Sequence, residues 1–201
     1  MTIINGRACV FNGTPVDKVF SNGQQVYGRN FLSMSKTFKP VGAGNSAPNQ
    51  NGGMISFAGH KTVADLFKAG DYIATSYDVK FLNTELYVNS ENVFIALQMW
   101  GGNWERLSSV GVKSVNGKFY TKDYSNQSIY IENPTHKVTV SATRQLTQSF
   151  ITANATGNSV ECLYNAIPAG AGIEITGLKI EKVKNINSVA TPWTPAPEDV
   201  M

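Results

Sequence analysis

The feature that most constrains the fold of this chain is an alternation of apolar side chains near its C-terminal end. In the run S-V-E-C-L-Y-N (159–165), Val160, Cys162 and Tyr164 occupy every second position. After the turn I-P-A-G, the run I-E-I-T-G-L-K-I-E-K-V (173–183) again places aliphatic residues among charged ones. A period of two is typical of β-strands that bury one face. The pattern predicts two half-buried antiparallel strands joined by a tight turn, with Cys162 in the core.

The segment after these strands, T-P-W-T-P-A-P (191–197), is expected to leave the sheet. Its three prolines lack the backbone N–H that a central strand needs. Trp193, which lies among them, is large and apolar, so we expect it to fix the tail to the body of the domain.

Similar alternation recurs along the chain at spacings of about a dozen residues, which is typical of strands in sandwiches and barrels. The predicted strands span 71–81, 92–100, 114–120 (around an Asn-Gly turn), 128–132 and 136–145. One helix is predicted at 61–69, with Thr62 as N-cap, Asp65 three residues later and Gly70 at its end. Charged residues are 15% of the chain, against ~25% in average domains. The predicted fold class is all-β: an antiparallel β-sandwich (jelly roll) with one short helix.

The first 28 residues contain three Asn-Gly pairs beside β-branched or aromatic residues (I-I-N-G, V-F-N-G-T-P-V and V-F-S-N-G-Q-Q-V-Y-G). Asn-Gly favours tight hairpin turns because both residues tolerate positive φ. Residues 1–28 are therefore predicted to form a β-hairpin arm, and residues 29–201 the main domain. Because an isolated hairpin is only marginally stable, the arm is expected to pack on the main domain, on a second copy of the chain or on another protein.

Three stretches resemble a known family. The motifs I-P-A-G-A-x-I-E-I-x-x-L-K-I-E-K and A-T-x-W-T-P-A-P-E-D resemble the final strands of carbohydrate-binding-module-like jelly-roll domains in tail and baseplate proteins of phages of Gram-positive bacteria. The stretch V-D-K-V-F-S-N-G-Q-Q-V-Y-G-R-N resembles the N-terminal arms that precede such domains. The resemblance implies a non-enzymatic virion protein that binds host cell-wall polysaccharide. It also implies contact with other tail or baseplate proteins and a homo-oligomer, with a trimer as one form.

Charge and hydropathy argue against nucleic acid and membranes as partners of this protein. The net charge is +3 and no block of five like charges occurs, whereas nucleic-acid binding favours a dense basic stripe. No apolar run approaches the ~18 residues of a membrane-spanning helix. The start M-T-I-I-N-G-R lacks the charged and apolar regions of a signal peptide. We therefore expect a protein made in the host cytoplasm and carried in the virion, without nucleic-acid binding or membrane insertion.

The motifs of the chain do not indicate catalysis. Its 14 carboxylates are scattered, and its two histidines belong to no recognisable catalytic motif. A glycan hydrolase or lyase, the enzymatic alternative, would need two carboxylates across one cleft, for which Asp78, Glu132 and Glu161 are candidates on separate strands. No cofactor is expected. The resemblance allows a structural Ca²⁺, but no EF-hand-like spacing indicates one.

A saccharide site is predicted in the stretch Q-M-W-G-G-N-W-E-R (98–106). Sugars present flat C–H faces that stack on aromatic rings, and hydroxyl groups that bond amides and charged groups. The predicted ligand-binding residues are Trp100, Trp104, Gln98 and Asn103, with Tyr124 and Tyr130 in second rank. The alternative is that the tryptophans anchor the core or a protein interface, in which case the chain is a purely structural tail or baseplate component.

Overall fold

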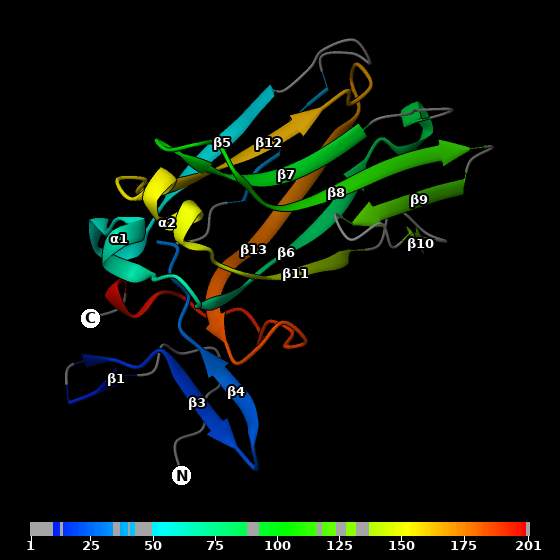
Figure 1. Ribbon diagram of the computed structural model, residues 1–201. Coiled ribbons are helices and arrows are strands. Elements are labelled where there is room, and N and C mark those ends of the chain that lie inside the picture. The colour runs from blue at the N-terminus through cyan, green and yellow to red at the C-terminus, as the bar shows by residue number, and fades with distance from the viewer. Residues whose placement is uncertain are drawn as a thin grey trace.

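The computed structural model describes residues 10–12, 14–33, 37–39, 41–42, 50–87, 93–115, 118–123, 128–131 and 137–199. In these residues a larger and a smaller antiparallel β-sheet lie face to face (Figure 1). From edge to edge, the larger sheet contains β10 (Ser128–Ile131), β9 (Lys118–Asp123), β8 (Arg106–Val115), β7 (Val93–Trp100), β12 (Ser159–Asn165) and β5 (Gln50–Ser56). The smaller sheet contains β11 (Val138–Gln145), β6 (Tyr72–Leu82) and β13 (Gly172–Val183). The predicted all-β sandwich is confirmed.

The hydrophobic core fills the space between these two sheets. Val160 and Cys162 of β12 are at most 1% exposed, and Ile173 and Ile175 of β13 are fully buried. The two C-terminal strands and the core position of Cys162 are therefore confirmed. The prediction of a half-buried strand is wrong for β12, because Glu161 and Leu163 on its other face are only 4% and 6% exposed. Each fully buried aliphatic side chain of this size stabilises the fold by about 1.5–3 kcal/mol. The other faces of the two sheets point away from this core.

The predicted helix is shorter than its sequence pattern suggested. α1 (Val63–Leu66) begins at the predicted capping box, in which Asp65 Oδ2 accepts a 2.8 Å hydrogen bond from the Thr62 backbone N–H, and the Thr62 hydroxyl accepts one from the Asp65 N–H. The helix ends at Leu66 because Phe67 adopts an extended conformation, so the predicted stop at Gly70 is wrong.

A second helix, α2 (Gln148–Asn154), corrects the prediction of a single helix. Its N-cap is Thr147, whose hydroxyl accepts a 3.1 Å hydrogen bond from the Phe150 N–H. Two turns are too short to show a 3.6-residue repeat, which is why the sequence pattern gave no signal. None of the helices in the described residues is long and apolar enough to span a membrane. The 3-10 helices are η1 (Ala58–His60), η2 (Thr84–Tyr87) and η3 (Pro197–Asp199).

The described part of the arm, residues 10–12 and 14–28, forms two small two-stranded sheets. Their strands are β1 (Val10–Phe11), β2 (Thr14–Pro15), β3 (Lys18–Ser21) and β4 (Gln24–Gly28). Asn22 and Gly23 have φ of 49° and 77°, so the predicted Asn-Gly hairpin turn between β3 and β4 is confirmed. The Lys18 ammonium donates a 2.9 Å hydrogen bond to the Val183 carbonyl at the end of β13. The pairs Asn5-Gly6 and Asn116-Gly117 lie outside the described residues, and the domain boundary at residue 28 stays a prediction.

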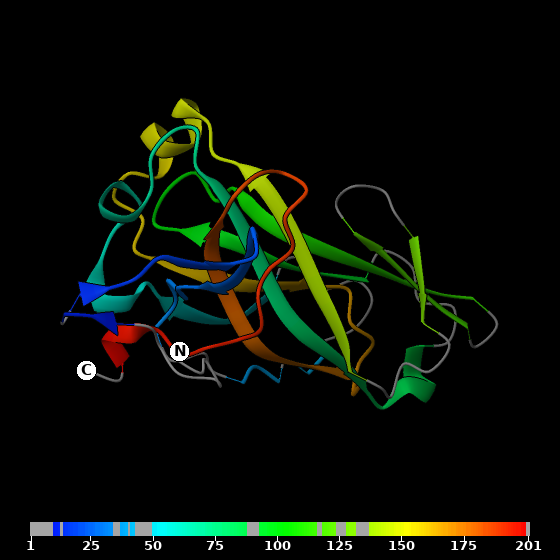
Figure 2. The same cartoon turned by 90° about the horizontal axis from the view of Figure 1, so that it is seen from below.

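The C-terminal tail leaves the sheet after β13, as the prolines predicted, and returns past the outer face of the smaller sheet (Figure 2). Its anchor is Thr191. The Thr191 hydroxyl donates to Glu181 (2.7 Å) and accepts from the Lys179 ammonium (2.7 Å) and from the Gly28 N–H (3.1 Å). That is the full capacity of a hydroxyl group.

The anchor rests on a buried ion pair. Lys179 Nζ and Glu181 Oε2 lie 2.9 Å apart, and both side chains are fully buried. The Thr191 backbone N–H also donates to Glu181, and Lys179 donates to the Pro192 carbonyl. Thr191 is therefore one of the residues that fix the tail, together with Thr194, Glu198 and Asp199, which bond Asn30, Arg29 and Ser33. Trp193, which we expected to fix it, is 43% exposed.

Candidate functional site

The core of the predicted site lies where β7 ends and turns into β8. Along β7, Leu97 and Met99 belong to the core, so the alternating positions Gln98 and Trp100 face away from the smaller sheet. The Met99 N–H donates a 3.0 Å hydrogen bond to the Glu105 carbonyl and closes the base of the connecting loop. We call Trp100 and the loop residues 101–104 the tryptophan corner.

Two glycines allow the corner to turn tightly. Gly101 has φ of 79°, in the left-handed region that favours glycine. Gly102 packs so closely on Asn154 that a Cβ there would lie 2.4 Å from the Asn154 Oδ1 and 3.0 Å from its Cα. The Gly-Gly pair in the sequence is therefore required by a turn and by a close approach to α2.

The side chain of Asn154, on α2, holds the loop in place. Its side chain is fully buried, its Oδ1 accepts a 2.9 Å hydrogen bond from the Asn103 N–H, and its Nδ2 donates to the Phe150 carbonyl (3.0 Å). Asn154 was not predicted from the sequence, because it lies on the unpredicted α2, 51 residues from Asn103. No local pattern could have found it, since the contact exists only after folding.

Trp104 is held in an unusual backbone conformation. Its φ is 53°, which is rare for a bulky residue other than glycine. Conformations of this kind cost on the order of 1–3 kcal/mol and concentrate at functional sites. Even so, the Trp104 side chain is 48% exposed, so burial does not explain its position. The Trp100 and Trp104 rings meet edge to face, with centroids 4.4 Å apart and planes at 83°.

Charged residues support the corner from its other side. Arg144 of β11 forms an ion pair with Glu105 and donates a 2.8 Å hydrogen bond to the Arg106 carbonyl. The Arg106 guanidinium in turn lies 4.5 Å from the centroid of the Phe94 ring. Arg106 is half-buried, and Asn103, in the loop between the two tryptophans, is exposed.

Gln98 has a different role from the one predicted. Its amide N–H donates a 2.7 Å hydrogen bond to Glu161 Oε2 of the neighbouring strand, and the two residues are only 8% and 4% exposed. On the core side of the same strand, burial raises the pKa of the Cys162 thiol to about 12, and the charge of Glu161 adds to this. The thiol is therefore neutral at ordinary pH and is no candidate nucleophile.

The structure brings four of the six predicted residues together. Trp100, Trp104 and Asn103 form the corner, and Gln98 lies next to it at its buried base. Tyr130 lies on β10, three strands from β7, and its side chain is not described. Tyr124 lies outside the described residues.

The three carboxylates considered for catalysis are not brought together in the described residues. Asp78 is on β6 of the smaller sheet and Glu161 on β12 of the larger one, and Glu132 lies outside the described residues. In that same part of the chain, no group of three or more His, Cys, Asp or Glu side chains is placed to hold a metal ion.

No family model and no curated protein matches this sequence. Among solved structures, the chain is similar to the sugar-binding C-terminal domain of EclA (10% identity, 74% of this chain and 79% of that chain, TM-score 0.38). It is also similar to the tripod from the baseplate of bacteriophage Tuc2009 (15% identity, 87% of this chain and 61% of that chain, TM-score 0.43). A third is described as "CBM4 structure and function" (7% identity, 76% and 88%, TM-score 0.34). This chain thus spans less than two thirds of the tripod chain, and likeness at this level carries no argument about function.

Proposed function

We propose that this protein is a non-enzymatic, saccharide-binding component of a phage tail or baseplate, and that the tryptophan corner is its ligand site. The observation that supports this most is the exposed indole of Trp104 at a φ of 53°. A strained and exposed aromatic residue has a cost that the fold does not recover by burial. Ligand binding is the function that would retain it.

The corner has the chemistry that a sugar ring requires. The C–H face of a pyranose stacks on one indole, while the second indole, at 83° to the first, borders the edge of the ring. The exposed side chain of Asn103, in the same loop, offers an amide to the hydroxyl groups. Because the loop is fixed by Asn154 and Arg144, little ordering entropy is lost when a ligand binds.

The proposal is non-enzymatic because both carboxylates near the corner are already bound. Glu105 is paired with Arg144, and Glu161 accepts from Gln98 in a buried setting. A single exposed stacking site binds weakly, and repetition of the protein around a tail would raise the overall avidity for a repetitive cell-wall polysaccharide. The proposed location is therefore the virion.

Tryptophan fluorescence can test this function. The full chain is titrated with cell-wall polysaccharides purified from Gram-positive bacteria, alongside Trp104→Ala and the control Leu86→Ala, which removes another exposed apolar side chain. We expect a saturable signal change with one polysaccharide. In Trp104→Ala we expect a loss of affinity of about tenfold or more, because the ring on which the sugar stacks is removed. Equal affinity in Trp104→Ala and wild type would exclude the corner as the site.

A purely structural role is the second candidate, and the arm favours it. Phe11 and Phe20 are 70% and 47% exposed on the arm hairpins, which suits attachment to another tail protein or to a second copy. This role predicts an oligomer in light scattering that Phe11→Ser and Phe20→Ser dissociate, together with no response to any polysaccharide. A monomer at all concentrations would remove the homo-oligomer from this alternative.

A further inference from the structure

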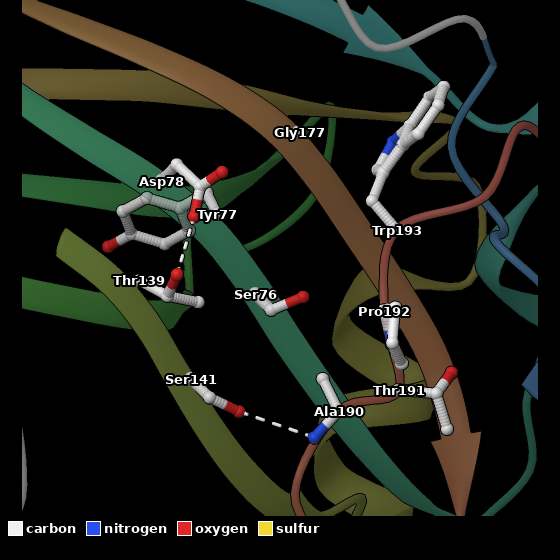
Figure 3. Close-up of a pocket in the computed structure, with 10 residues that line it drawn as sticks. All are labelled: Ser76, Tyr77, Asp78, Thr139, Ser141, Gly177, Ala190, Thr191, Pro192 and Trp193. Atoms are coloured by element: carbon white, nitrogen blue, oxygen red, sulfur yellow. Dashed lines mark hydrogen bonds between the residues drawn. The ribbon is translucent and has the colours of Figure 1, made fainter. Parts of the chain in front are cut away.

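A hollow of about 340 Å³ lies on the outer face of the smaller sheet, where the C-terminal tail crosses it (Figure 3). Its floor comes from β6, β11 and β13, and its wall is the tail segment 190–193. We call it the tail pocket. It is built by strands and a tail that are far apart in sequence, and it is separate from the tryptophan corner, which lies on the other sheet.

The floor of the tail pocket carries hydroxyl groups around one carboxylate. Asp78 Oδ1 accepts a 2.6 Å hydrogen bond from the Thr139 hydroxyl, and Asp78 Oδ2 lies 2.7 Å from the Lys137 ammonium. A carboxylate can accept about four hydrogen bonds, so Asp78 has capacity for further donors. Ser141 Oγ accepts from the Ala190 N–H at 3.4 Å and keeps its own hydrogen for another acceptor.

Ser76 adds a further hydroxyl group to the lining of the tail pocket. The residue as a whole is 8% exposed, but its hydroxyl oxygen is not one of the fully buried polar atoms that lack a partner. In Figure 3 this hydroxyl points across the pocket, between β6 and the tail. Because a hydroxyl can both donate and accept a hydrogen bond, Ser76 offers one more polar contact to a hydroxyl-rich molecule in the pocket.

Trp193 supplies the apolar side of the tail pocket. A Cβ on Gly177 would lie 4.0 Å from the indole of Trp193 and 3.6 Å from Asp78 Oδ2, so glycine leaves open the space between ring and carboxylate. The indole is 43% exposed. It therefore presents a free face beside a group that accepts hydrogen bonds.

The wall of the tail pocket is held in place before any ligand arrives. Thr191 and Pro192, which precede Trp193, are bonded to the buried Lys179–Glu181 pair. This fixes the indole relative to the floor strands and lowers the ordering cost of binding. An aromatic face, one carboxylate and several hydroxyls on a rigid frame suit a neutral pyranose better than a phosphate, which a carboxylate would repel.

We propose that the tail pocket binds a single pyranose ring, which stacks on Trp193 and donates hydroxyl hydrogens to Asp78. Ser76 and Ser141 provide further hydrogen bonds to the same ring. This second site does not depend on the tryptophan corner. Together the two sites would place sugar-binding surfaces on the outer faces of both sheets.

Because the chain has three tryptophans, sugar binding at both sites can be measured in one experiment. The ¹⁵N-labelled full chain is titrated with glucose, galactose, rhamnose, N-acetylglucosamine and N-acetylgalactosamine, and the three indole N–H signals, assigned by single substitutions, are followed by NMR. We expect the Trp193 signal to shift saturably with at least one sugar. No saturable shift of Trp193 with any of the five would overturn the proposal.

Substitutions then locate the contact. Asp78→Asn and Ser141→Ala are each expected to weaken the Trp193 response, Asp78→Asn by about tenfold or more because it removes a charge-assisted hydrogen bond. Val189→Ala, which trims a 75% exposed residue of the same tail, is the control and should leave the affinity unchanged. Unchanged affinity in both Asp78→Asn and Ser141→Ala would overturn the site. Shifts of Trp100 and Trp104 report the corner alone, so failure of one site is distinguishable from failure of the other.

Discussion

The tryptophan corner and the tail pocket both present an indole on an outer face of the sandwich, but they are built in different ways. The corner is local: Trp100 and Trp104 are four residues apart on one β-turn-β connection, and a strained φ holds the exposed ring. The tail pocket gathers Asp78 of β6, Ser141 of β11 and Trp193 of the tail, which are distant in sequence, and relies on a buried ion pair to hold its wall.

This difference in construction determines which substitutions should disrupt each site. The corner depends on local backbone geometry and on a contact with α2, so it should survive when the tail is loosened. The tail pocket depends on the global fold, because its wall is attached through Thr191 to β13 and to the arm at once. Substitutions can therefore separate the two sites.

The largest effect is expected from Glu181→Gln. It leaves the fully buried Lys179 without its opposite charge, and breaking such a pair costs about 3–5 kcal/mol. We expect a loss of that size in the free energy of unfolding, measured by urea denaturation, and loss of any sugar response at Trp193 while the corner signals persist. Glu174→Gln, on the same strand but paired with an exposed Lys39, is the matched control and should change stability little. A loss below about 1 kcal/mol in Glu181→Gln would show that the pair does not hold the tail.

The ion pair also shows what sequence reasoning could not reach. Lys179 and Glu181 alternate with Leu178 and Ile180, which correctly predicted a strand with one apolar face. The same alternation predicts a solvated charged face, but the arm and the tail cover it, and both charges are fully buried. Burial by a segment distant in sequence leaves no periodic signal.

Elsewhere in the molecule, too, features that depend on neighbouring residues were predictable, and features that depend on distant segments were not. The Thr62 capping box and the two C-terminal strands depend on neighbouring residues, and they were predictable. β5 was not, because Q-N-G-G-M-I-S is rich in turn residues and forms a strand only by pairing with β12. The corner was predictable as a cluster of tryptophans, whereas its supports on α2 and β11, and the whole tail pocket, required the fold.

Two buried side chains in the core between the two sites should make the stability of the fold depend on alkaline pH. Burial raises the pKa of Cys162, beneath the larger sheet, from 9.0 to about 12, so above pH 9 the unfolded thiol loses its proton while the native one keeps it. Stability from this group is complete below pH 9 and falls as pH rises toward 12, with a slope approaching about 1.4 kcal/mol per pH unit. Burial also raises the pKa of Tyr77, which lies beneath the tail pocket. Because the ordinary pKa of this tyrosine is 10.0, the loss of stability from Tyr77 begins at a higher pH than the loss from Cys162.

Urea denaturation at a series of alkaline pH values checks this order. Cys162→Ala should reduce the slope from pH 9 upward, and Tyr77→Phe should reduce it only above pH 10. The comparison uses slopes, because both substitutions also change the stability at neutral pH through packing. An unchanged slope in Cys162→Ala would mean that the thiol ionises as readily in the folded protein as in the unfolded one.

The smallest effect distinguishes the two exposed indoles by their backbones. Trp104 has φ of 53°, where glycine is tolerated and alanine is not, whereas Trp193 is not among the positive-φ residues of the described chain. Trp104→Gly should therefore be more stable than Trp104→Ala by about 1 kcal/mol, although both remove the same ring. At Trp193 the order should reverse, with glycine less stable than alanine by roughly 0.5–1 kcal/mol. Thermal unfolding of the four variants measures both differences. If alanine is the more stable at both positions, the corner carries no backbone strain, and the strain argument for a ligand at Trp104 fails.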